Sequence, residues 1–272
     1  MPTLYVVATP IGNLEDITLR AIRVLTEASL IAAEDTRRTL KLLNALNIKV
    51  PLTSYYEHNK LSKLDYIISK LEEGDVALVS DAGTPGIADP GYELIAAAID
   101  HGFRVEVIPG PSSVITALAV SGLPAAEFRF MAFLPRKTSE RRAALERLAA
   151  DPATLVFLEA PHRVTETLEA MAGTLGNRRT AVCRELTKIH EEVFRGTLAG
   201  ALSHFTKPKG EFVIVVEGSK AVEVPPVLND GIIEQLKKLK HDGVPAKEAT
   251  ARLATDTGLP RRELYGAWLK LK

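Results

Sequence analysis

The chain has 272 residues, of which 46% are apolar, and its 34 lysine and arginine residues balance 34 aspartate and glutamate residues. Any affinity for a polyanion must therefore come from local clusters of cations and not from the field of the whole molecule. The single cysteine, Cys183, excludes an intrachain disulfide, and no apolar stretch approaches the ~18 residues that suggest a membrane span. No secretory leader pattern opens the sequence, so we expect a cytoplasmic protein.

The first half of the sequence alternates apolar runs with stretches of helical spacing. Strands are expected over residues 4–9, 30–33, 76–79 and 105–108. Helices are expected from a cap at Asp16 to Ala28, and over residues 61–71, 91–101 and 112–122. This alternation predicts an α/β fold with a mostly parallel sheet, and Leu123-Pro124 breaks the last helix. We therefore expect an N-terminal α/β domain over residues 1–122.

The second half repeats the alternation. Strands are expected over residues 128–133, 154–158, 180–184 and 211–217, and helices over 139–149 and 164–175. The run 212–216 is apolar on both faces, so we expect it at the centre of a second, mixed α/β domain over residues 125–222. Pro225-Pro226 marks a linker, and residues 227–272 are expected to form a small helical tail, either a helix-turn-helix unit or a cap over an apolar surface.

Three of the expected strands in the first half end in loops of turn-forming residues. These loops are Pro10-Ile11-Gly12-Asn13-Leu14, the segment SDAGTPGIADPG at 80–91, and PGPSS at 109–113. Glycine lets a backbone approach a ligand closely, and proline fixes φ before anything binds. Ligands of open α/β sheets bind outside the carboxyl ends of the strands, so we expect the three loops to line one cleft. The alternative for residues 80–91 is a polar surface turn.

Familiar nucleotide and metal motifs are absent from the sequence. Neither GxGxxG nor GxxxxGK[ST] occurs, which speaks against a dinucleotide fold and a P-loop NTPase. The histidines and the cysteine lack metal-ligand spacing, with no HExxH or CxxC, so we predict no metal site.

Six motifs occur in a characteristic order: TPIGNLEDIT from residue 9, AEDTRRT from 33, SDAGTPGIADPG from 80, PGPSS with SGLP from 109, EAPHR from 159 and RELTKIHEE from 184. Together they resemble the ribosomal RNA small-subunit methyltransferase I family, a branch of the tetrapyrrole methylase (class III) methyltransferases. The resemblance spans residues 3 to 218. Other branches carry a GDP-type loop where this chain has Ser80-Asp81-Ala82-Gly83.

The resemblance implies an activity, a cofactor and a partner. A member of this family methylates the 2′-hydroxyl of a cytidine in the decoding region of 16S rRNA, as a homodimer with S-adenosylmethionine in the interdomain cleft. The expected cofactor-binding residues are Pro10, Ile11, Asp81, Gly83, Thr84, Ser112, Ser113, Leu158, Arg184 and Phe212. Ordinary core packing is the alternative for Ile11, Leu158 and Phe212. The competing functions are a tetrapyrrole-type small-molecule methyltransferase and a noncatalytic RNA-binding protein.

Methyl transfer to a ribose hydroxyl needs orientation and a group that handles the acceptor proton. Glu34, Asp35 and Arg37 follow an expected strand and are candidates for this work, with a surface ion pair as the alternative. His162 is the fourth candidate, because an imidazole pKa near ~6.5 suits proton transfer.

A cluster of cations at the start of the second domain is the candidate RNA-binding surface. It contains Arg136, Lys137, Arg141 and Arg142. Such a cluster neutralises backbone phosphates while the total charge stays at zero. A solvated helix face is the alternative.

Overall fold

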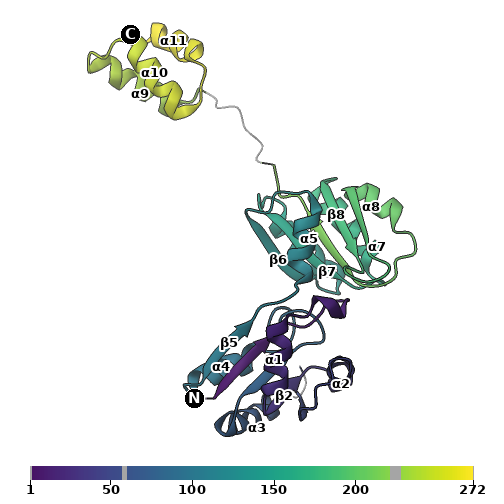
Figure 1. Ribbon diagram of the computed structural model, residues 1–272. Coiled ribbons are helices and arrows are strands. Elements are labelled where there is room, and N and C mark those ends of the chain that lie inside the picture. The colour runs from purple at the N-terminus through teal and green to yellow at the C-terminus, as the bar shows by residue number, and fades with distance from the viewer. Residues whose placement is uncertain (1, 57–59, 221–227, 272) are drawn as a thin grey trace. The chain divides into compact units, whose positions relative to one another are not determined.

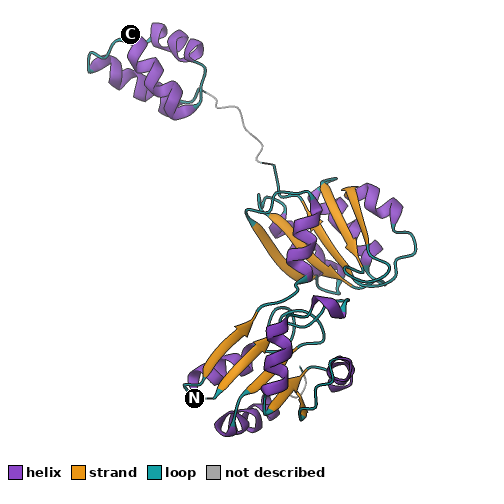
Figure 2. Ribbon diagram, viewed as in Figure 1, coloured by secondary structure: helices purple, strands orange, loops and turns teal. Residues whose placement is uncertain are grey.

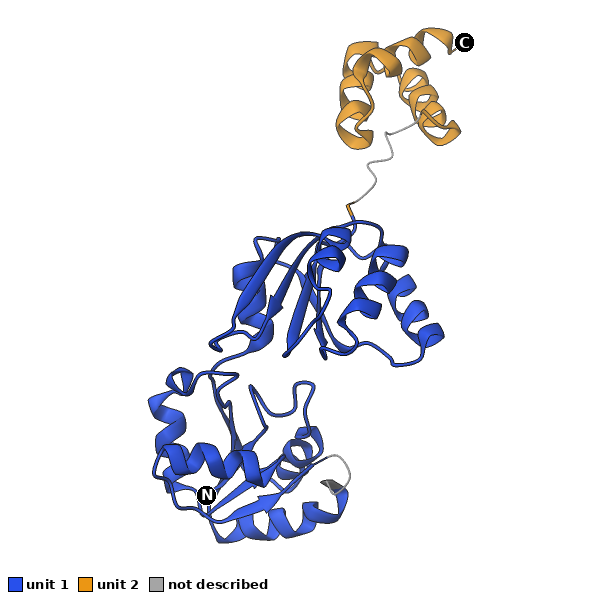
Figure 3. Cartoon of the chain, turned by 90° about the vertical axis from the view of Figure 1, so that its right-hand side faces the viewer, with its two compact units in different colours: residues 1–219 blue, residues 220–272 orange. Residues whose placement is uncertain are grey.

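The computed structural model describes residues 2–56, 60–220 and 228–271. It separates into two compact units, Met1–Ser219 and Lys220–Lys272 (Figure 3). The first unit contains two five-stranded sheets with helices packed against them, and the described part of the second unit contains helices alone (Figure 2). Within the described residues, no helix is long and apolar enough to cross a membrane.

The first half of unit 1 is a three-layer α/β structure (Figure 1). Its elements are β1 (Thr3–Val7), the 3-10 turn η1 (Leu14–Asp16), α1 (Leu19–Glu27), β2 (Leu30–Ala33), α2 (Thr36–Ala45), β3 (Leu52–Ser54), α3 (Lys60–Glu73), β4 (Val76–Val79), α4 (Tyr92–Asp100), β5 (Arg104–Ile108) and α5 (Ser113–Ser121). The strand order is β3-β2-β4-β1-β5, and all pairs are parallel. Helices α1 and α2 pack on one face of the sheet, and α3 and α4 pack on the other.

Two details of this half differ from the sequence-based expectation. The cap of α1 is Thr18 and not Asp16, because the Ala21 N–H donates to the Thr18 hydroxyl at 3.1 Å while Asp16 lies in the preceding turn η1. The elements α2 and β3 have no expected counterpart. Helix α2 begins with the polar run Thr36-Arg37-Arg38, which hides the helical spacing of its buried residues Thr39 and Leu43, and β3, at three residues, is too short to give a clear period.

The second half of unit 1 contains the mixed sheet. Its elements are β6 (Phe128–Phe133), α6 (Thr138–Leu148), β7 (Thr154–Glu159), α7 (Val164–Leu175), β8 (Arg179–Arg184), β9 (Glu192–Thr197), α8 (Leu198–His204) and β10 (Phe212–Val216). The order is β6-β7-β10-β8-β9; β6 and β7 are parallel, and the other pairs are antiparallel. The central position of β10, buried along its whole length, confirms the expectation. The polar edge strand β9 and helix α8 were not apparent from the sequence pattern.

Helix α5 precedes the expected domain boundary at residue 122, yet it packs against the second sheet. Its residues Val114, Ala117 and Leu118 share a core with Cys183 and Val213. Helices α6, α7 and α8 cover the opposite face of that sheet. Without α5, the second sheet would expose an apolar face to water. Burial of that face stabilises the packing of α5, which precedes the sheet in the chain, against it. The loop before α5 consequently connects the two sheets.

The second unit has a core of its own. It contains α9 (Asp230–His241), α10 (Ala246–Thr257) and α11 (Arg261–Lys270). Leu236, Leu253, Leu264 and Trp268 from the three helices are buried together. Gly258 ends α10 at a φ of 72°, in the left-handed region, so α10 and α11 are joined by the glycine turn expected from the sequence. Helix α9 adds a third element to that pair.

Candidate active site

The three turn-rich loops of the first sheet meet at one place, as the sequence predicts. Strands β4, β1 and β5 are neighbours and parallel, so their carboxyl ends lie side by side. The N–H groups of Thr9 and Gly83 donate to each other's carbonyl oxygens at 2.9 and 3.0 Å. A Cβ on Gly110 would lie 3.0 Å from the Ala8 Cβ, so the loop after β5 also touches the end of β1. The loops form one continuous wall.

Glycine is required for the fold of the loop over residues 80–91. Gly83 and Gly86 have φ values of 80° and 79°, which glycine adopts without steric cost. A Cβ on Gly91 would lie 2.7 Å from the Gly86 nitrogen, so the end of the loop touches its middle through bare backbone. Ala88 is held at a φ of 65°, which is strained for a residue with a side chain. The loop therefore folds back on itself and presents Asp81 and Asp89 from a fixed backbone.

A second strained loop approaches from the other sheet. Glu185 and Thr187, which follow β8, have φ values of 50° and 65°. Lys188 holds this loop through ion pairs of 2.8 Å to Glu185 and to Glu211. A Cβ on Gly12 would lie 2.5 Å from the Lys188 Cγ, so the loop after β1 packs directly under this segment. The two sheets are thus in contact at the ends of their strands.

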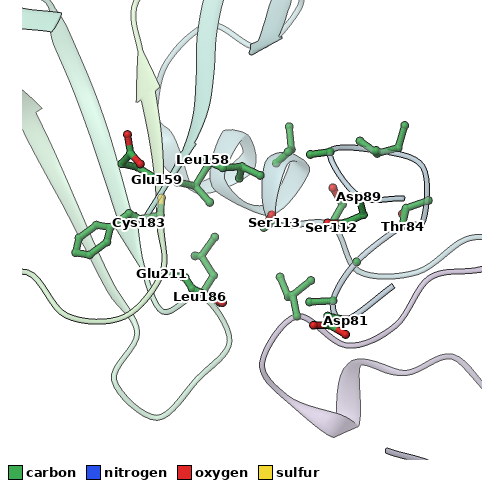
Figure 4. A pocket seen from close by; sticks show the side chains of 18 of the residues that line it. Asp81, Thr84, Asp89, Ser112, Ser113, Leu158, Glu159, Cys183, Leu186 and Glu211 are labelled. Atoms are coloured by element: carbon green, nitrogen blue, oxygen red, sulfur yellow. The ribbon is translucent and has the colours of Figure 1, made fainter. Parts of the chain in front are cut away.

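A cavity of about 690 Å³ lies where these loops meet. Figure 4 shows residues of the first sheet's loops facing residues from the strand ends of the second sheet across it. Its lining includes Ile11, Glu34, Arg38, Asp81, Gly83, Thr84, Asp89, Ser112, Ser113, Ile115, Leu158, Glu159, Cys183, Leu186, Lys188, Glu211 and Phe212. The volume is in the range of small-molecule and cofactor sites.

Three carboxylates on the first-sheet side of the cavity perturb one another. Burial raises the pKa of Asp89 to about 6, and the nearby charges of Glu34 and Asp81 add to this effect. Burial also raises the pKa values of Glu34 and Asp81, although the Arg38 guanidinium, 3.2 Å from the Asp81 carboxylate, partly offsets the effect at Asp81. The Asp81 N–H donates to Glu34 at 3.2 Å, and the Asp35 N–H donates to Asp81 at 3.1 Å. The wall is negatively charged and internally hydrogen-bonded.

Most of the residues expected to bind a cofactor lie around this cavity. Ile11, Asp81, Gly83, Thr84, Ser112, Ser113, Leu158 and Phe212 all border it. The Phe212 ring, however, is buried against Phe205 among the core residues under α6–α8. Pro10 borders an adjacent, smaller cavity. Arg184 is outside the lining and pairs with Glu192 at 2.8 Å, while its neighbour in β8, Cys183, lines the cavity. The alternation of side chains along β8 explains that difference.

The expected catalytic residues separate into two groups. Glu34 lines the cavity. Asp35 and Arg37 instead form a two-bonded pair with each other, at 3.1 and 2.8 Å, and Arg37 is 88% exposed. His162 is exposed and lies outside the cavity lining, beside the lining residue Pro161. The surface ion pair proposed as the alternative for Asp35 and Arg37 is therefore the arrangement found.

The expected RNA-binding cluster is only partly available at the surface. Arg141 does not belong to it, because its side chain is 2% exposed and pairs with Glu166. Lys137 pairs with Glu140 at 3.0 Å and Arg142 with Glu146 at 2.9 Å, so both cations are already partly neutralised. Arg136 is exposed, and no ion pair is found for it among the described residues. Helical spacing explains this result, since α6 turns Arg141 toward α7 and its neighbours toward solvent.

Several site residues were missed in the sequence. Asp89 lies in the loop that is expected to line the cleft but is not among the expected cofactor-binding residues. Lys188 lies in the motif from residue 184, where nothing in the local pattern distinguishes it from a surface charge. Arg38 follows Arg37 by one position, and only the direction of α2 decides which guanidinium reaches Asp81. Cys183 lines the cavity as a buried thiol whose pKa is raised by burial to about 11, so it is not a reactive nucleophile.

The chain matches the family model of the Tetrapyrrole (Corrin/Porphyrin) Methylases over residues 3–202. It is similar to the protein named ribosomal RNA small subunit methyltransferase I from Halalkalibacterium halodurans, with 49% identity over 98% of this chain and 94% of that protein. The protein of the same name from Escherichia coli O157:H7 is 44% identical over 96% of this chain and 93% of its own. The one from Thermotoga maritima is 47% identical, and 81% of this chain covers 100% of it.

Two solved structures resemble this chain in fold. Uroporphyrin-III C-methyltransferase from Thermus thermophilus, complexed with S-adenyl homocysteine, has a TM-score of 0.57 and 21% identity over 80% of this chain and 97% of that chain. The methyltransferase CobJ has a TM-score of 0.61 and 18% identity over 80% of this chain and 95% of that chain. The two structures share the fold, and the family model and the relatives show that the chain belongs to the tetrapyrrole methylase family and, within it, to the ribosomal RNA small subunit methyltransferase I family.

Proposed function

We propose that this protein transfers the methyl group of S-adenosylmethionine to the ribose 2′-hydroxyl of a cytidine in the decoding region of 16S rRNA. Methyl transfer is the activity of the family to which the chain belongs, and its full-length relatives are named for small-subunit ribosomal RNA. The observation that carries the proposal is the acidic, glycine-walled cavity at the joined strand ends of a chain that is 49% identical to such a relative.

The residues of the cavity fit this cofactor. When bound, S-adenosylmethionine supplies an electrophilic methyl group on a positively charged sulfonium. Asp81 and Asp89 provide negative charge for that cation, and Ile11, Leu158 and Leu186 provide apolar surface for an adenine. The bare backbone of Gly83 and the hydroxyl of Ser112 supply close approach and hydrogen bonds. Within the described residues, no group of histidine, cysteine, aspartate or glutamate side chains is arranged to hold a metal ion.

The acceptor hydroxyl must lose its proton as its oxygen gains the methyl group. Asp89 suits this task, because a carboxylate with a pKa of about 6 is mostly ionised at neutral pH and is still basic enough to accept a proton. Glu34 is the second candidate, since its pKa is also raised by burial and it lines the same cavity. We assign no proton transfer to His162, which lies outside the lining.

The activity is expected to depend on pH through Asp89. Its raised pKa means that the unliganded fold favours the protonated form, so the stability that this group contributes is lost as the pH rises from its ordinary pKa of 3.8 through about 6. Activity depends on pH in the opposite direction to stability, because only the ionised carboxylate can accept a proton. We expect kcat/KM to fall about tenfold for each pH unit below pH 6. Rate–pH profiles check this slope. Asp89→Asn should lower kcat/KM and remove its fall below pH 6. Asp65→Asn, on the exposed side of α3, should leave both the activity and its pH dependence unchanged.

The competing functions are weaker on specific grounds. The uroporphyrin-III C-methyltransferase neighbours are 21 to 23% identical, a level that shows the fold and not the substrate. A cavity of about 690 Å³ lined by carboxylates of raised pKa is typical of a catalytic site, and noncatalytic RNA binding does not require one.

A homodimer in the cytoplasm belongs to the same proposal. Two of the four edge strands, β5 and β6, expose apolar side chains, with Val107 54% and the cavity-lining Phe133 52% exposed. Exposed apolar residues on sheet edges favour association with another chain. Sedimentation of the purified protein measures the oligomeric state.

The decisive experiment maps 2′-O-methyl groups on 16S rRNA from cells with and without the protein. Loss of one cytidine mark on deletion, and its restoration by purified protein with S-adenosylmethionine and small subunits from the deleted cells, is the expected result. An unchanged methylation map would contradict the proposal. Methylation of a porphyrinoid by the purified protein would favour the small-molecule function instead.

A further inference from the structure

A second cavity of about 270 Å³ shares a wall with the first. It is lined by Thr9, Pro10, Gly12, Leu14, Arg38, Lys41, Leu42 and Asp81. Arg38 and Asp81 border both cavities, and they pair with each other at 3.2 Å. The ion pair is therefore the partition between the two sites. The rest of the second cavity is built by the loop after β1 and by one side of α2.

The two cavities differ in the sign of their charge. In the first, Glu34 and Asp89 line the wall, and no cation is found in an ion pair with either one among the described residues. In the second, Asp81 is the sole acidic residue of the lining, against the two cations Arg38 and Lys41. Lys41 is exposed, and the described part of the chain offers it no carboxylate partner. One site therefore suits a cation and the adjacent site suits an anion.

The proposed reaction brings together ligands of these two signs. A sulfonium methyl donor is a cation, and an RNA strand carries one phosphate beside every ribose. Resting on that proposed function, we propose that the second cavity binds a phosphodiester of the acceptor RNA strand, held by Lys41 and Arg38. The reacting ribose then lies against the Arg38–Asp81 partition, between the bound phosphate and the first cavity.

The remaining lining fits the same occupant. Leu14, 51% exposed, and Leu42 give the cavity an apolar side on which a ribose or a base can pack. The cavity is smaller than the ~300 Å³ at which ordinary ligand sites begin, which matches part of a polymer better than a complete small molecule. Gly12 closes the site without a side chain, because a Cβ there would collide with Lys188 and Leu186.

Lys41 provides a clean test, because it borders the second cavity and not the first. Lys41→Glu is expected to weaken binding of the RNA by about tenfold or more, the effect of losing one charge-assisted contact. Lys41→Ala should weaken it less and should lower the salt slope of binding by about one. Cofactor affinity, measured by calorimetry, should not change. The probe is a fluorescent oligoribonucleotide of decoding-region sequence, measured by anisotropy, together with KM for small subunits.

The matched control is Lys49→Glu. Lys49 is also exposed and without an ion pair among the described residues, but it precedes β3 and so lies at the amino ends of the parallel strands, opposite the site. Equal effects of Lys41→Glu and Lys49→Glu would overturn the phosphate site, as would an equal loss of cofactor affinity in Lys41→Glu. These outcomes are separate from failure of the proposed function, which would appear as absence of RNA methylation by the unaltered protein.

Competition by inorganic phosphate is a second test of the site. Inorganic phosphate that competes with the oligonucleotide only in the unaltered protein, and not in Lys41→Ala, would support the site. Competition that is the same in both would count against it.

Discussion

Replacing Asp81 with asparagine is expected to weaken cofactor binding by about ten- to a hundredfold, the effect of losing charge-assisted contacts. The Asp81 carboxylate accepts the Asp35 N–H at 3.1 Å and pairs with Arg38 at 3.2 Å, and its own N–H fixes Glu34. Asparagine keeps the volume and one acceptor but removes the negative charge that pairs with Arg38 and that we propose faces the sulfonium. Calorimetric titration with S-adenosylmethionine measures the change.

Asp35→Asn is the matched variant for this measurement. Asp35 is outside the lining of both cavities; it caps α2 and pairs with Arg37 at the surface. Its pKa is lowered to about 2 by the hydrogen bonds from Arg37, so it is ionised throughout the working range. We expect cofactor affinity within about twofold of the unaltered protein. If Asp81→Asn binds the cofactor as tightly as Asp35→Asn does, Asp81 is not part of the cofactor site.

The meeting of three loops could be predicted from the sequence for a physical reason. A parallel sheet places the carboxyl ends of its strands together, so Gly12, Gly83 and Gly110 had to lie near one another once their strands were adjacent. The apolar run of β10 likewise predicts its central place, since both of its faces are buried. These inferences depend on periodicity and topology, which the sequence carries directly.

The roles of individual charges could not be predicted in the same way. Arg141 looked like its neighbours in the basic run, but the turn of α6 buries it against Glu166. Lys188 reaches the cavity because Glu185 and Thr187 adopt left-handed backbone, a conformation that no residue preference predicts. The position of α5 depends on the need to cover a distant sheet, and it is a tertiary effect. Side-chain direction and long-range packing are therefore what the sequence leaves open.

Arg163→Met is expected to reduce the free energy of unfolding of the first unit by about 3–5 kcal/mol. Glu159, at the end of β7, is 2% exposed, and its carboxylate accepts from Thr167 at 2.6 Å and from the Ala160 N–H at 3.0 Å. The Arg163 Nε, 3.5 Å away, is the cation that compensates this buried charge. Arg163 also donates to the Leu134 carbonyl oxygen at 2.7 Å, so its loss leaves a charge and a carbonyl unsatisfied.

The double variant Glu159→Gln with Arg163→Met tests the cause of that loss. Removing the carboxylate charge together with its partner should recover about half or more of the stability, because a neutral amide costs less to bury than an unpaired charge. Arg142→Met, which breaks the exposed pair with Glu146, should change stability by less than about 1 kcal/mol. Urea unfolding of the three variants is followed by circular dichroism. Tryptophan fluorescence is unsuitable, because the single tryptophan, Trp268, lies in the second unit. Equal losses in Arg163→Met and in the double variant would show that packing of the arginine, and not the charge of Glu159, stabilises the end of β7.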